Sequence, residues 1–184
     1  MTRCCGTSVG ILVVDQQDRL LMIERGWWPV GIAPVAGHVR DAHDTVAEAL
    51  HTEVAEEVGL TVTGEPTLLW EGHRPNLCQS LPATPVPGHH WWLYRATATG
   101  TLTPAAGETR GAAWYRLDQV QELADRTIAH AHGAVTADEF EARPGLEAVW
   151  VAHLAQLGMI AVSDADLAAV ETLYTTPPPE YWMG

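Results

Sequence analysis

Basic residues, cysteines and long hydrophobic runs are all scarce in this chain. Lys and Arg together number 10 against 23 Asp and Glu, which gives a formal net charge of −13. Because duplex nucleic acids are bound through a basic surface, a duplex-binding function is not expected. No run approaches the roughly 18 apolar residues that span a membrane, and the N-terminus lacks a charged segment followed by an apolar one. We therefore expect a cytoplasmic protein that binds neither membranes nor duplex nucleic acid.

The cysteines do not have the spacing of a metal site. Three are present, Cys4, Cys5 and Cys78, and two of them are adjacent. An odd number of cysteines without ligand-like spacing is typical of reduced cytosolic thiols. The nine histidines include His89-His90 and His130-x-His132, but no helical His-x3-His pair accompanies the cysteines. By spacing alone, a dedicated zinc site is therefore disfavoured.

The remaining composition is ordinary for a globular protein. The chain has 184 residues, of which 47% are hydrophobic and 18% charged. This length is enough for one domain with a sizeable core and short for two. We therefore expect a single domain over residues 1–184.

The most informative stretch is Gly37–Leu60, which predicts a loop followed by a helix. Thr45 and Glu48 have the spacing of a helix capping box, and Gly59 is a typical helix stop. Between them, aliphatic residues recur at every fourth position and predict an apolar stripe along the helix. These residues are Val46, Leu50, Val54 and Val58.

Three carboxylates lie at the edge of that stripe. At about 100° per residue, Glu53, Glu56 and Glu57 fall within an arc of roughly 100° beside the apolar face. Carboxylates this close repel one another, and at least one would be driven to protonate. A hard divalent cation such as Mg²⁺ removes the conflict, because it binds carboxylate oxygens and accepts substrate phosphates as further ligands. We therefore expect a metal site here, although a solvated helix face is the more common role of glutamates.

This stretch resembles the sequence box of the Nudix hydrolases, Gly-x5-Glu-x7-Arg-Glu-U-x-Glu-Glu-x-Gly-U, in which U is a bulky aliphatic residue. The second half matches at the family's spacing, with Glu53, Val54, Glu56, Glu57, Gly59 and Leu60. The resemblance implies an α/β fold, an α/β/α sandwich with a mixed sheet, and Mg²⁺ or Mn²⁺ as cofactor. It also implies that Glu53, Glu56 and Glu57 are catalytic and bind the metal, with the carbonyl of Gly37 as a further ligand.

The first half of the box departs from the family pattern. Six residues, one more than usual, separate Gly37 from Asp44, which stands in place of a glutamate. We place the extra residue in the loop, because an insertion within the helix would rotate the acids off their common face. Thr52 replaces the arginine that usually holds a catalytic glutamate through an ion pair. We expect this change to affect turnover more than metal binding.

The flanking sequence predicts a succession of strands. Two β-rich runs, Ser8–Val14 and Arg19–Glu24, are separated by a short polar turn and predict a hairpin. Pro34 predicts an edge or loop position for Gly31–Gly37. The proline-rich stretch Gly72–Gly88 predicts a long loop. Further strands are predicted at Thr61–Thr63, Thr67–Glu71, Trp91–Thr99 and Ala112–Tyr115, and a helix from Leu117 to about Ala131.

The family fold is thus expected at about residues 7–131, followed by a helical extension at about 133–176 that decorates the same domain. Capping pairs at Thr136–Glu139 and Ser163–Asp166 predict two helix starts there, and Leu146–Leu157 has amphipathic spacing. The tail that contains Tyr181 and Trp182 suggests packing against a second subunit. A homodimer is one interpretation of it, and the oligomeric state stays open.

Several residues outside the helix are candidates for catalysis or substrate binding. Nudix enzymes often carry a further acid ahead of a Trp-aromatic pair, so the resemblance implies a catalytic role for Glu108, ahead of Trp114. An exposed loop carboxylate is the alternative. His38 in the box loop is a candidate phosphate contact, and so is His43. Arg74 in the proline-rich loop is a candidate for a phosphate or a base.

Tryptophan is unusually frequent, with eight against one phenylalanine. Trp27, Trp28, Trp91 and Trp92 are all candidates to stack on a nucleobase. Core packing is the more common role of such residues, so we expect one of the four to contact substrate. Trp28 and Trp92 are taken as the candidate substrate-binding residues.

Three functions are compatible with these residues. The first is Mg²⁺-dependent hydrolysis of a nucleoside diphosphate linked to another group. The second is a nucleotide-binding or sensor module that lost catalysis, suggested by Thr52, the inserted residue and Gly111, where the family frequently has a glutamate. The third, a diphosphate isomerase, has no specific support. The intact set of three glutamates favours the enzyme, because a binding module has no evident need for clustered carboxylates.

Overall fold

The computed structural model describes residues 3–40, 43–82, 88–107, 109–179 and 181. The strands are β1 (Thr7–Val13), β2 (Leu20–Arg25), β3 (Ile32–Ala33), β4 (Val35–His38), β5 (Thr61–Arg74), β6 (His89–Thr99) and β7 (Thr109–Tyr115). The helices are α1 (Val46–Val58), α2 (Leu117–Ala131), α3 (Ala137–Ala142), α4 (Ala148–Gln156) and α5 (Asp164–Thr175).

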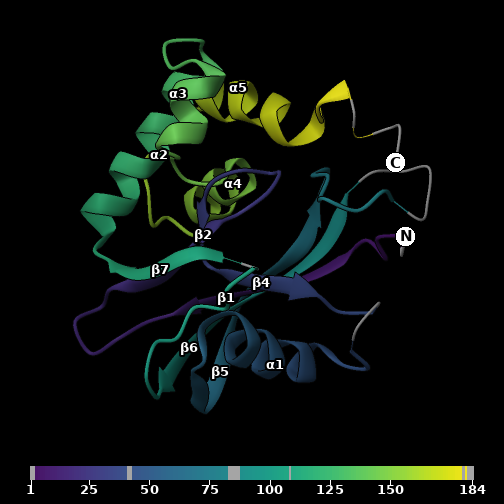
Figure 1. Ribbon diagram of the computed structural model, residues 1–184, viewed down its shortest axis with the longest axis vertical. Helices are drawn as coiled ribbons and strands as arrows, with labels where there is room; N and C mark the ends of the chain where they lie inside the picture. Colours follow the sequence, from purple (N-terminus) through teal and green to yellow (C-terminus); the bar gives the residue numbers. More distant parts are fainter. Residues whose placement is uncertain (1–2, 41–42, 83–87, 108, 180, 182–184) are drawn as a thin grey trace.

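Two sheets form the middle layer of the molecule. One has the strand order β4-β1-β6-β5 and the other β3-β2-β7. The β1–β6 pair is parallel and the other pairs are antiparallel. Helix α1 covers one side of this layer, and α2 to α5 cover the other (Figure 1). The expected α/β/α sandwich with mixed pairing is confirmed.

The expected hairpin between the first two strands is wrong. The turn exists, with the Asp15 carboxylate accepting from the backbone N–H groups of Gln17 and Arg19, each at 2.9 Å. Beyond an isolated bridge between Val14 and Leu20, however, β1 and β2 separate into different sheets. They separate because β4 and β6 already pair with the two edges of β1. The edge position expected around Pro34 is confirmed, since β3 and β4 each lie at the edge of a sheet.

Helix α1 begins and ends where the sequence predicts. The Thr45 side chain accepts from the backbone N–H of Glu48 at 3.1 Å, and Gly59 ends the helix with a left-handed φ of 71°. The Glu48 carboxylate accepts from the N–H of Asp44 instead of closing the expected box on Thr45. The helix runs without interruption, so an insertion in the box lies outside it.

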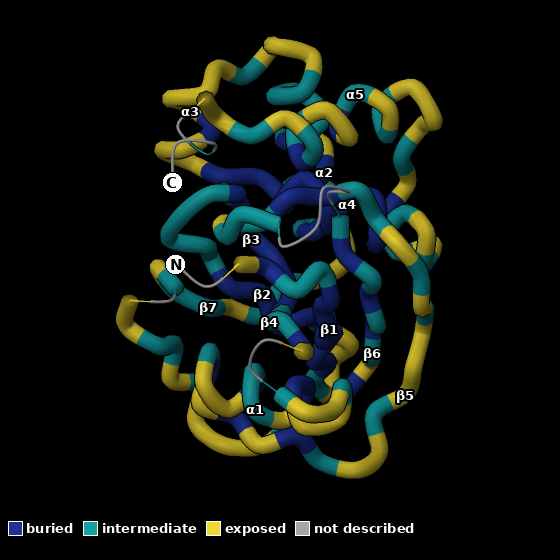
Figure 2. Tube along the Cα trace, turned by 90° about the vertical axis from the view of Figure 1, so that its right-hand side faces the viewer, coloured by how far each residue is buried: buried dark blue, intermediate teal, exposed yellow. Residues whose placement is uncertain are grey.

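Alternate residues of β1 face the two sides of the sheet and contribute to two cores. Val9, Ile11 and Val13 pack with the buried stripe of α1. Leu12 packs on the other side with α4, whose residues from Ala148 to Leu154 are all buried. In Figure 2, β1, β2 and α4 are coloured as buried residues. Helix α4 therefore forms part of the core, a closer role than the expected decoration.

The remaining differences concern β5 and its loop. The two predicted strand pieces merge into β5, which passes through irregular pairing between Thr63 and Thr67. It continues to Arg74, so the first residues of the expected Gly72–Gly88 loop are strand.

The capping box of Thr136 and Glu139 is confirmed at α3. Within the described residues, every helix is too short or too polar to cross a lipid bilayer.

Candidate functional site

The C-terminal half of α1 places two carboxylates against strand β4. Glu53 lies so close to Gly37 that a Cβ atom at this position would overlap its carboxylate. The backbone N–H of Ala36 donates to Glu57 Oε2 at 3.4 Å. Glycine is needed at position 37 because the carboxylate fills the space that a side chain would take. Glu56, one position before Glu57, is exposed on the same helix.

The pKa of Glu53 is raised, as expected, but repulsion between carboxylates is not the main cause. Burial is the main cause that raises the pKa of this carboxyl, and the charge of Glu56 adds to the effect. A hydrogen bond and the charge of His43 act in the opposite direction. The ionised form of Glu53 therefore needs a compensating positive charge nearby.

His43 is the basic side chain beside Glu53 in the described structure. Its Nε2 lies 3.5 Å from Glu53 Oε1, and both side chains are largely buried, with 9% and 16% of their areas exposed. The backbone of His43 is held by a hydrogen bond from its N–H to the carbonyl of Val39 at 2.7 Å. His43 thus contacts Glu53, which directly follows position 52, where the family box has an arginine.

The donor set fits a hard divalent cation. The candidate ligands are carboxylate oxygens, joined by the backbone at Gly37, and Mg²⁺ and Mn²⁺ prefer oxygen ligands. The raised pKa of Glu53 and the close approach of its carboxylate to the backbone at Gly37 both agree with such an ion. Glu53, Glu56 and Glu57 are therefore the residues that would hold it.

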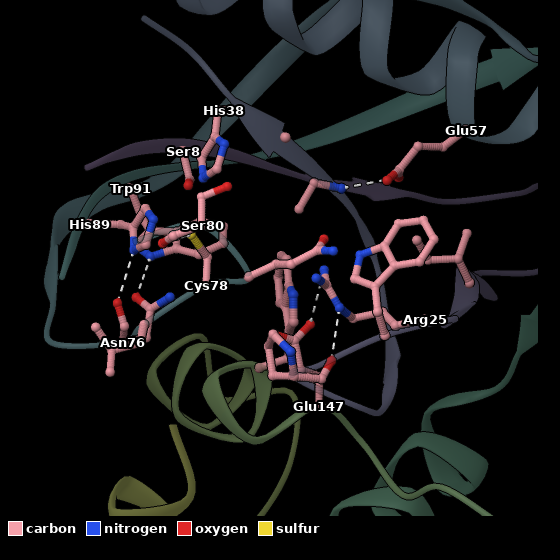
Figure 3. Close-up of a pocket in the computed structure, with 18 residues that line it drawn as sticks. Ser8, Arg25, His38, Glu57, Asn76, Cys78, Ser80, His89, Trp91 and Glu147 are labelled. Atoms are coloured by element: carbon pink, nitrogen blue, oxygen red, sulfur yellow. Dashed lines mark hydrogen bonds and ion pairs between the residues drawn. The ribbon is translucent and has the colours of Figure 1, made fainter. Parts of the chain in front are cut away.

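A pocket of about 250 Å³ opens beside these carboxylates (Figure 3). Gly37 and Glu57 line one part of it, and Arg25, Trp27 and Glu147 line another. A third part of the wall is formed by His38, Cys78, His89 and Trp91. The pocket is therefore lined by Glu57 of α1 together with a cation and aromatic rings.

Buried Glu147 and partly exposed Arg25 form an ion pair at this pocket. Arg25 Nη1 lies 3.7 Å from Glu147 Oε2, and Arg25 Nε donates to the carbonyl of Pro29 at 2.9 Å. Burial raises the pKa of Glu147, which precedes α4, and the charge of Arg25 opposes the effect. In Figure 3, the two side chains lie on the opposite side of the pocket from Glu57.

Comparison with known proteins identifies the family. A model of the NUDIX domain matches residues 6–138, which is more than half of the chain. The chain belongs to the Nudix family. A curated relative is the mouse NAD(P)H pyrophosphatase NUDT13, mitochondrial, which is 28% identical over 139 residues. The match covers 74% of this chain and 35% of the relative, so the chain spans about a third of that protein's length.

Solved Nudix structures have a similar fold. A NUDIX hydrolase from Nitrosomonas europaea has a TM-score of 0.51 and 18% identity, with 64% of this chain and 76% of that chain covered. The NUDIX domain of Shewanella oneidensis NrtR, complexed with ADP ribose, has a TM-score of 0.51 and 13% identity, with 66% and 79% covered. At these identities the likeness concerns the fold alone. The family model and these structures together identify a Nudix domain.

Within this Nudix domain, the other predicted substrate-binding residues lie in different places. His38 lines the pocket beside Gly37. The Arg74 guanidinium instead lies over the ring of Trp70 at 5.1 Å and donates to the carbonyl of Ala152. Trp28 packs on Tyr181 in another hollow, with ring centroids 5.3 Å apart. Trp92 has an edge contact with His90. Roles of Arg74, Trp28 and Trp92 in substrate binding stay predictions, away from this pocket.

The other two tryptophans of the predicted set line the Nudix pocket. Trp91 is buried and donates from Nε1 to Asn76 Oδ1 at 2.9 Å, which fixes it as part of the wall. Trp27 is half-buried, so its ring is the more accessible of the two. The family pattern also implied Glu108 as a catalytic acid. Glu108 lies outside the described residues, and its role stays a prediction.

Sequence reasoning missed Arg25, Glu147 and the contact between His43 and Glu53. Arg25 ends a strand and Glu147 precedes a helix, and neither belongs to a motif. The only available signal for Glu147 was an acid at the start of the apolar run 148–154. His43 was a candidate for phosphate contact, whereas its structural neighbour is a carboxylate.

Proposed function

We propose that this Nudix domain hydrolyses a diphosphate that links a nucleoside to another group, with a divalent cation held by Glu53, Glu56 and Glu57. The observation that carries the proposal is the packing of Glu53 against Gly37 and of Glu57 against Ala36, at a pocket lined by a cation and an aromatic ring. The mouse relative is an NAD(P)H pyrophosphatase, and NAD(P)H belongs to this chemical class.

The residues around the acids hold them in position. His43 stands beside Glu53, and the Ala36 N–H orients Glu57 through a hydrogen bond. The missing side chain at Gly37 lets the Glu53 carboxylate approach the strand. A bound divalent cation would orient the phosphates, screen their charge and lower the pKa of an attacking water.

The other part of the pocket suits the organic part of such a substrate. The guanidinium of Arg25 is a suitable donor for a phosphate or carboxylate oxygen, since it presents several N–H groups in a fixed plane. Its contact with Glu147 is long, at 3.7 Å, which leaves donors for a ligand. Trp27 offers an aromatic face of the kind on which a nucleobase stacks.

The contact between His43 and Glu53 weakens the main argument for a binding module without catalysis. Such a module was suggested by Thr52, which replaces the arginine of the family box, by the inserted residue and by Gly111. His43 contacts the same glutamate that the arginine would hold, so the Thr52 position does not leave Glu53 without a partner. The three acids remain together on one helix, as hydrolysis requires.

A substrate panel tests the proposal. The purified chain is incubated with Mg²⁺ or Mn²⁺ and NADH, ADP-ribose, nucleotide sugars, dinucleoside polyphosphates or nucleoside triphosphates, and the cleaved products are measured. We expect cleavage of at least one diphosphate-linked compound. Glu57→Gln should lower kcat by about 10²-fold or more, because metal-based stabilisation contributes several kcal/mol. Glu122→Gln, an exposed acid of α2, is the matched control and should keep parental activity. No cleavage across the panel, or full activity in Glu57→Gln, would contradict the proposal.

A further inference from the structure

Four side chains of metal-ligating types lie close together, and three of them line one side of the pocket. Cys4, His38, Cys78 and His89 each offer one ligand atom, and these four atoms all lie within 4.8 Å of one another. Figure 3 shows three of them, His38, Cys78 and His89, close together and apart from Glu57. They come from the segment before β1, the end of β4, the loop after β5 and the start of β6.

The distances are close to those of a tetrahedral zinc site. Cys4 Sγ lies 3.4 Å from His38 Nε2 and 3.0 Å from His89 Nε2. With Zn–S bonds of about 2.3 Å and Zn–N bonds of about 2.0 Å, a tetrahedral site places sulfur and nitrogen ligands about 3.5 Å apart and two sulfurs about 3.8 Å apart. Only small movements are needed to bring the four atoms to these separations.

The surroundings fix the orientation of the ligand atoms. His89 Nδ1 lies 3.0 Å from the carbonyl of Asn76, so this nitrogen carries the proton and Nε2 turns its lone pair toward Cys4. The N–H of Gly6 donates to Cys4 Sγ at 3.3 Å and holds this sulfur in place. Asn76 is itself held by the Nε1–H of Trp91. This second layer of hydrogen bonds is typical of built metal sites.

We propose that Cys4, His38, Cys78 and His89 bind one Zn²⁺ ion as a structural site. Two thiols and two imidazoles complete a four-coordinate shell, which leaves no open position for substrate. On binding, the two thiols release their protons to solvent and the imidazoles bind through Nε2. The Cys78 thiol, which donates to the carbonyl of Ser80 at 3.4 Å, would give up that contact.

The site lies in the same pocket wall as Glu57 but differs from the carboxylates in chemistry. Its sulfur and nitrogen ligands suit a borderline-soft ion, whereas oxygen ligands suit Mg²⁺. Its position explains what the ion would do. Strands β4 and β6 lie on either side of β1, so the ion would join His38 and His89 across the sheet and tie Cys78 to them. Because His38 follows Gly37, this cross-link would hold one wall of the pocket in place.

Metal analysis of the intact chain tests the proposal without reference to its activity. The protein is produced with zinc in the medium, freed from any histidine tag, dialysed against metal-free buffer and measured by mass spectrometry of the elements. We expect about one zinc per chain. The Cys4 and Cys78 thiols should resist a thiol reagent in the native protein and react once a chelator removes the ion.

The chain offers matched controls for the ligand variants. Cys78→Ser and His89→Gln should lose the bound zinc, with a lower thermal midpoint. Cys5→Ser and His90→Gln should keep it, because Cys5 contacts Thr7 and His90 contacts Glu71 instead. Zinc retained at the parental level in both Cys78→Ser and His89→Gln would overturn the proposal.

If those variants fail to fold, cobalt provides the test on the parent protein. Co²⁺ at this site should give intense tetrahedral absorption bands and a thiolate-to-cobalt charge-transfer band, and zinc should abolish both. Co²⁺ held only by carboxylates gives weak bands without charge transfer. Weak bands alone, a metal-free protein from zinc-supplemented cells, or a disulfide between Cys4 and Cys78 in mass spectrometry would each contradict the proposal.

Discussion

His43 takes the place beside Glu53 that the family box gives to an arginine. The family's arginine would stand on α1, at position 52, whereas His43 reaches the carboxylate from the loop before the helix. Both arrangements put a nitrogen donor next to a carboxylate whose pKa is raised by burial. The nitrogen donor beside the Glu53 carboxylate therefore comes from a different position in the chain.

Replacing His43 should slow the reaction without abolishing it. We expect His43→Gln to lower kcat by roughly tenfold, which corresponds to about 1.4 kcal/mol for one charge-assisted contact. His51→Gln, an exposed histidine on α1, is the control and should behave as the parent. Steady-state kinetics on the cleaved substrate makes the comparison. Parental kcat in His43→Gln would show that this histidine does not hold Glu53.

An arginine at position 52 tests the same idea from the other side. Because His43 already contacts Glu53, we expect Thr52→Arg to raise kcat only slightly in the parent. In the His43→Gln background it should restore up to about tenfold. A double-mutant cycle with these variants measures the coupling. Equal effects of Thr52→Arg in both backgrounds would mean that the two positions act independently.

At the level of elements, β1 and α4 pack closely because β1 has a glycine at the contact. A Cβ atom at Gly10 would lie 2.5 Å from Cη2 of Trp150 and 2.8 Å from Cδ2 of Leu93. We expect Gly10→Ala to lower the free energy of unfolding by about 1–3 kcal/mol through overpacking. Gly26→Ala is the control, since its nearest neighbour would be 3.9 Å away. Urea unfolding measures both, and equal stabilities would show that Trp150 shifts at little cost.

Helix α4 also carries a buried histidine enclosed by aromatic rings. The ring of His153 lies 4.8 Å from Trp91, 5.2 Å from Trp150 and 5.5 Å from Trp70, centroid to centroid. Neither of its ring nitrogens has a hydrogen-bond partner among the described residues. Burial is the main cause that lowers the pKa of His153 from 6.5 to about 3, and the charge of Arg74 adds to the effect.

This histidine predicts a pH dependence of stability. Above pH 6.5 the imidazole is neutral in both the folded and the unfolded chain, so its contribution is fully present. As the pH falls from 6.5 toward 3, the unfolded chain takes up a proton that the folded chain does not, so stability is lost. The loss approaches 1.4 kcal/mol per pH unit, on the order of one proton. His153→Leu should remove this part of the slope in urea unfolding, whereas His51→Leu should not. Parallel slopes in the parent and in His153→Leu would contradict the prediction.

For the molecule as a whole, local features were predictable and distant contacts were not. The bounds of α1 follow from capping residues and apolar spacing, which act within one element. The separation of β1 from β2 depends on which strands occupy the edges of β1, and these strands come much later in the chain. The same reason hid the Cys/His cluster, since Cys4 and His89 are 85 positions apart and no spacing rule joins them.

In the candidate site, too, local features were predictable from the sequence and distant contacts were not. The three glutamates were predictable because a helix turns sequence spacing into a shared face. Arg25 and Glu147 meet through packing between β2 and the start of α4, and neither lies in a recognisable motif. Trp28 and Trp92 were chosen from composition alone, and the pocket is lined by their neighbours Trp27 and Trp91.

Cation binding by the glutamates of α1 is the claim on which the proposed hydrolysis depends. Calorimetric titration with Mg²⁺ or Mn²⁺ measures it on the parent protein, on Glu53→Gln and Glu57→Gln, and on Glu122→Gln as the control. We predict that the parent and the control bind the cation and that Glu57→Gln weakens binding sharply. Unchanged affinity in both Glu53→Gln and Glu57→Gln would contradict the metal site and the hydrolysis built on it.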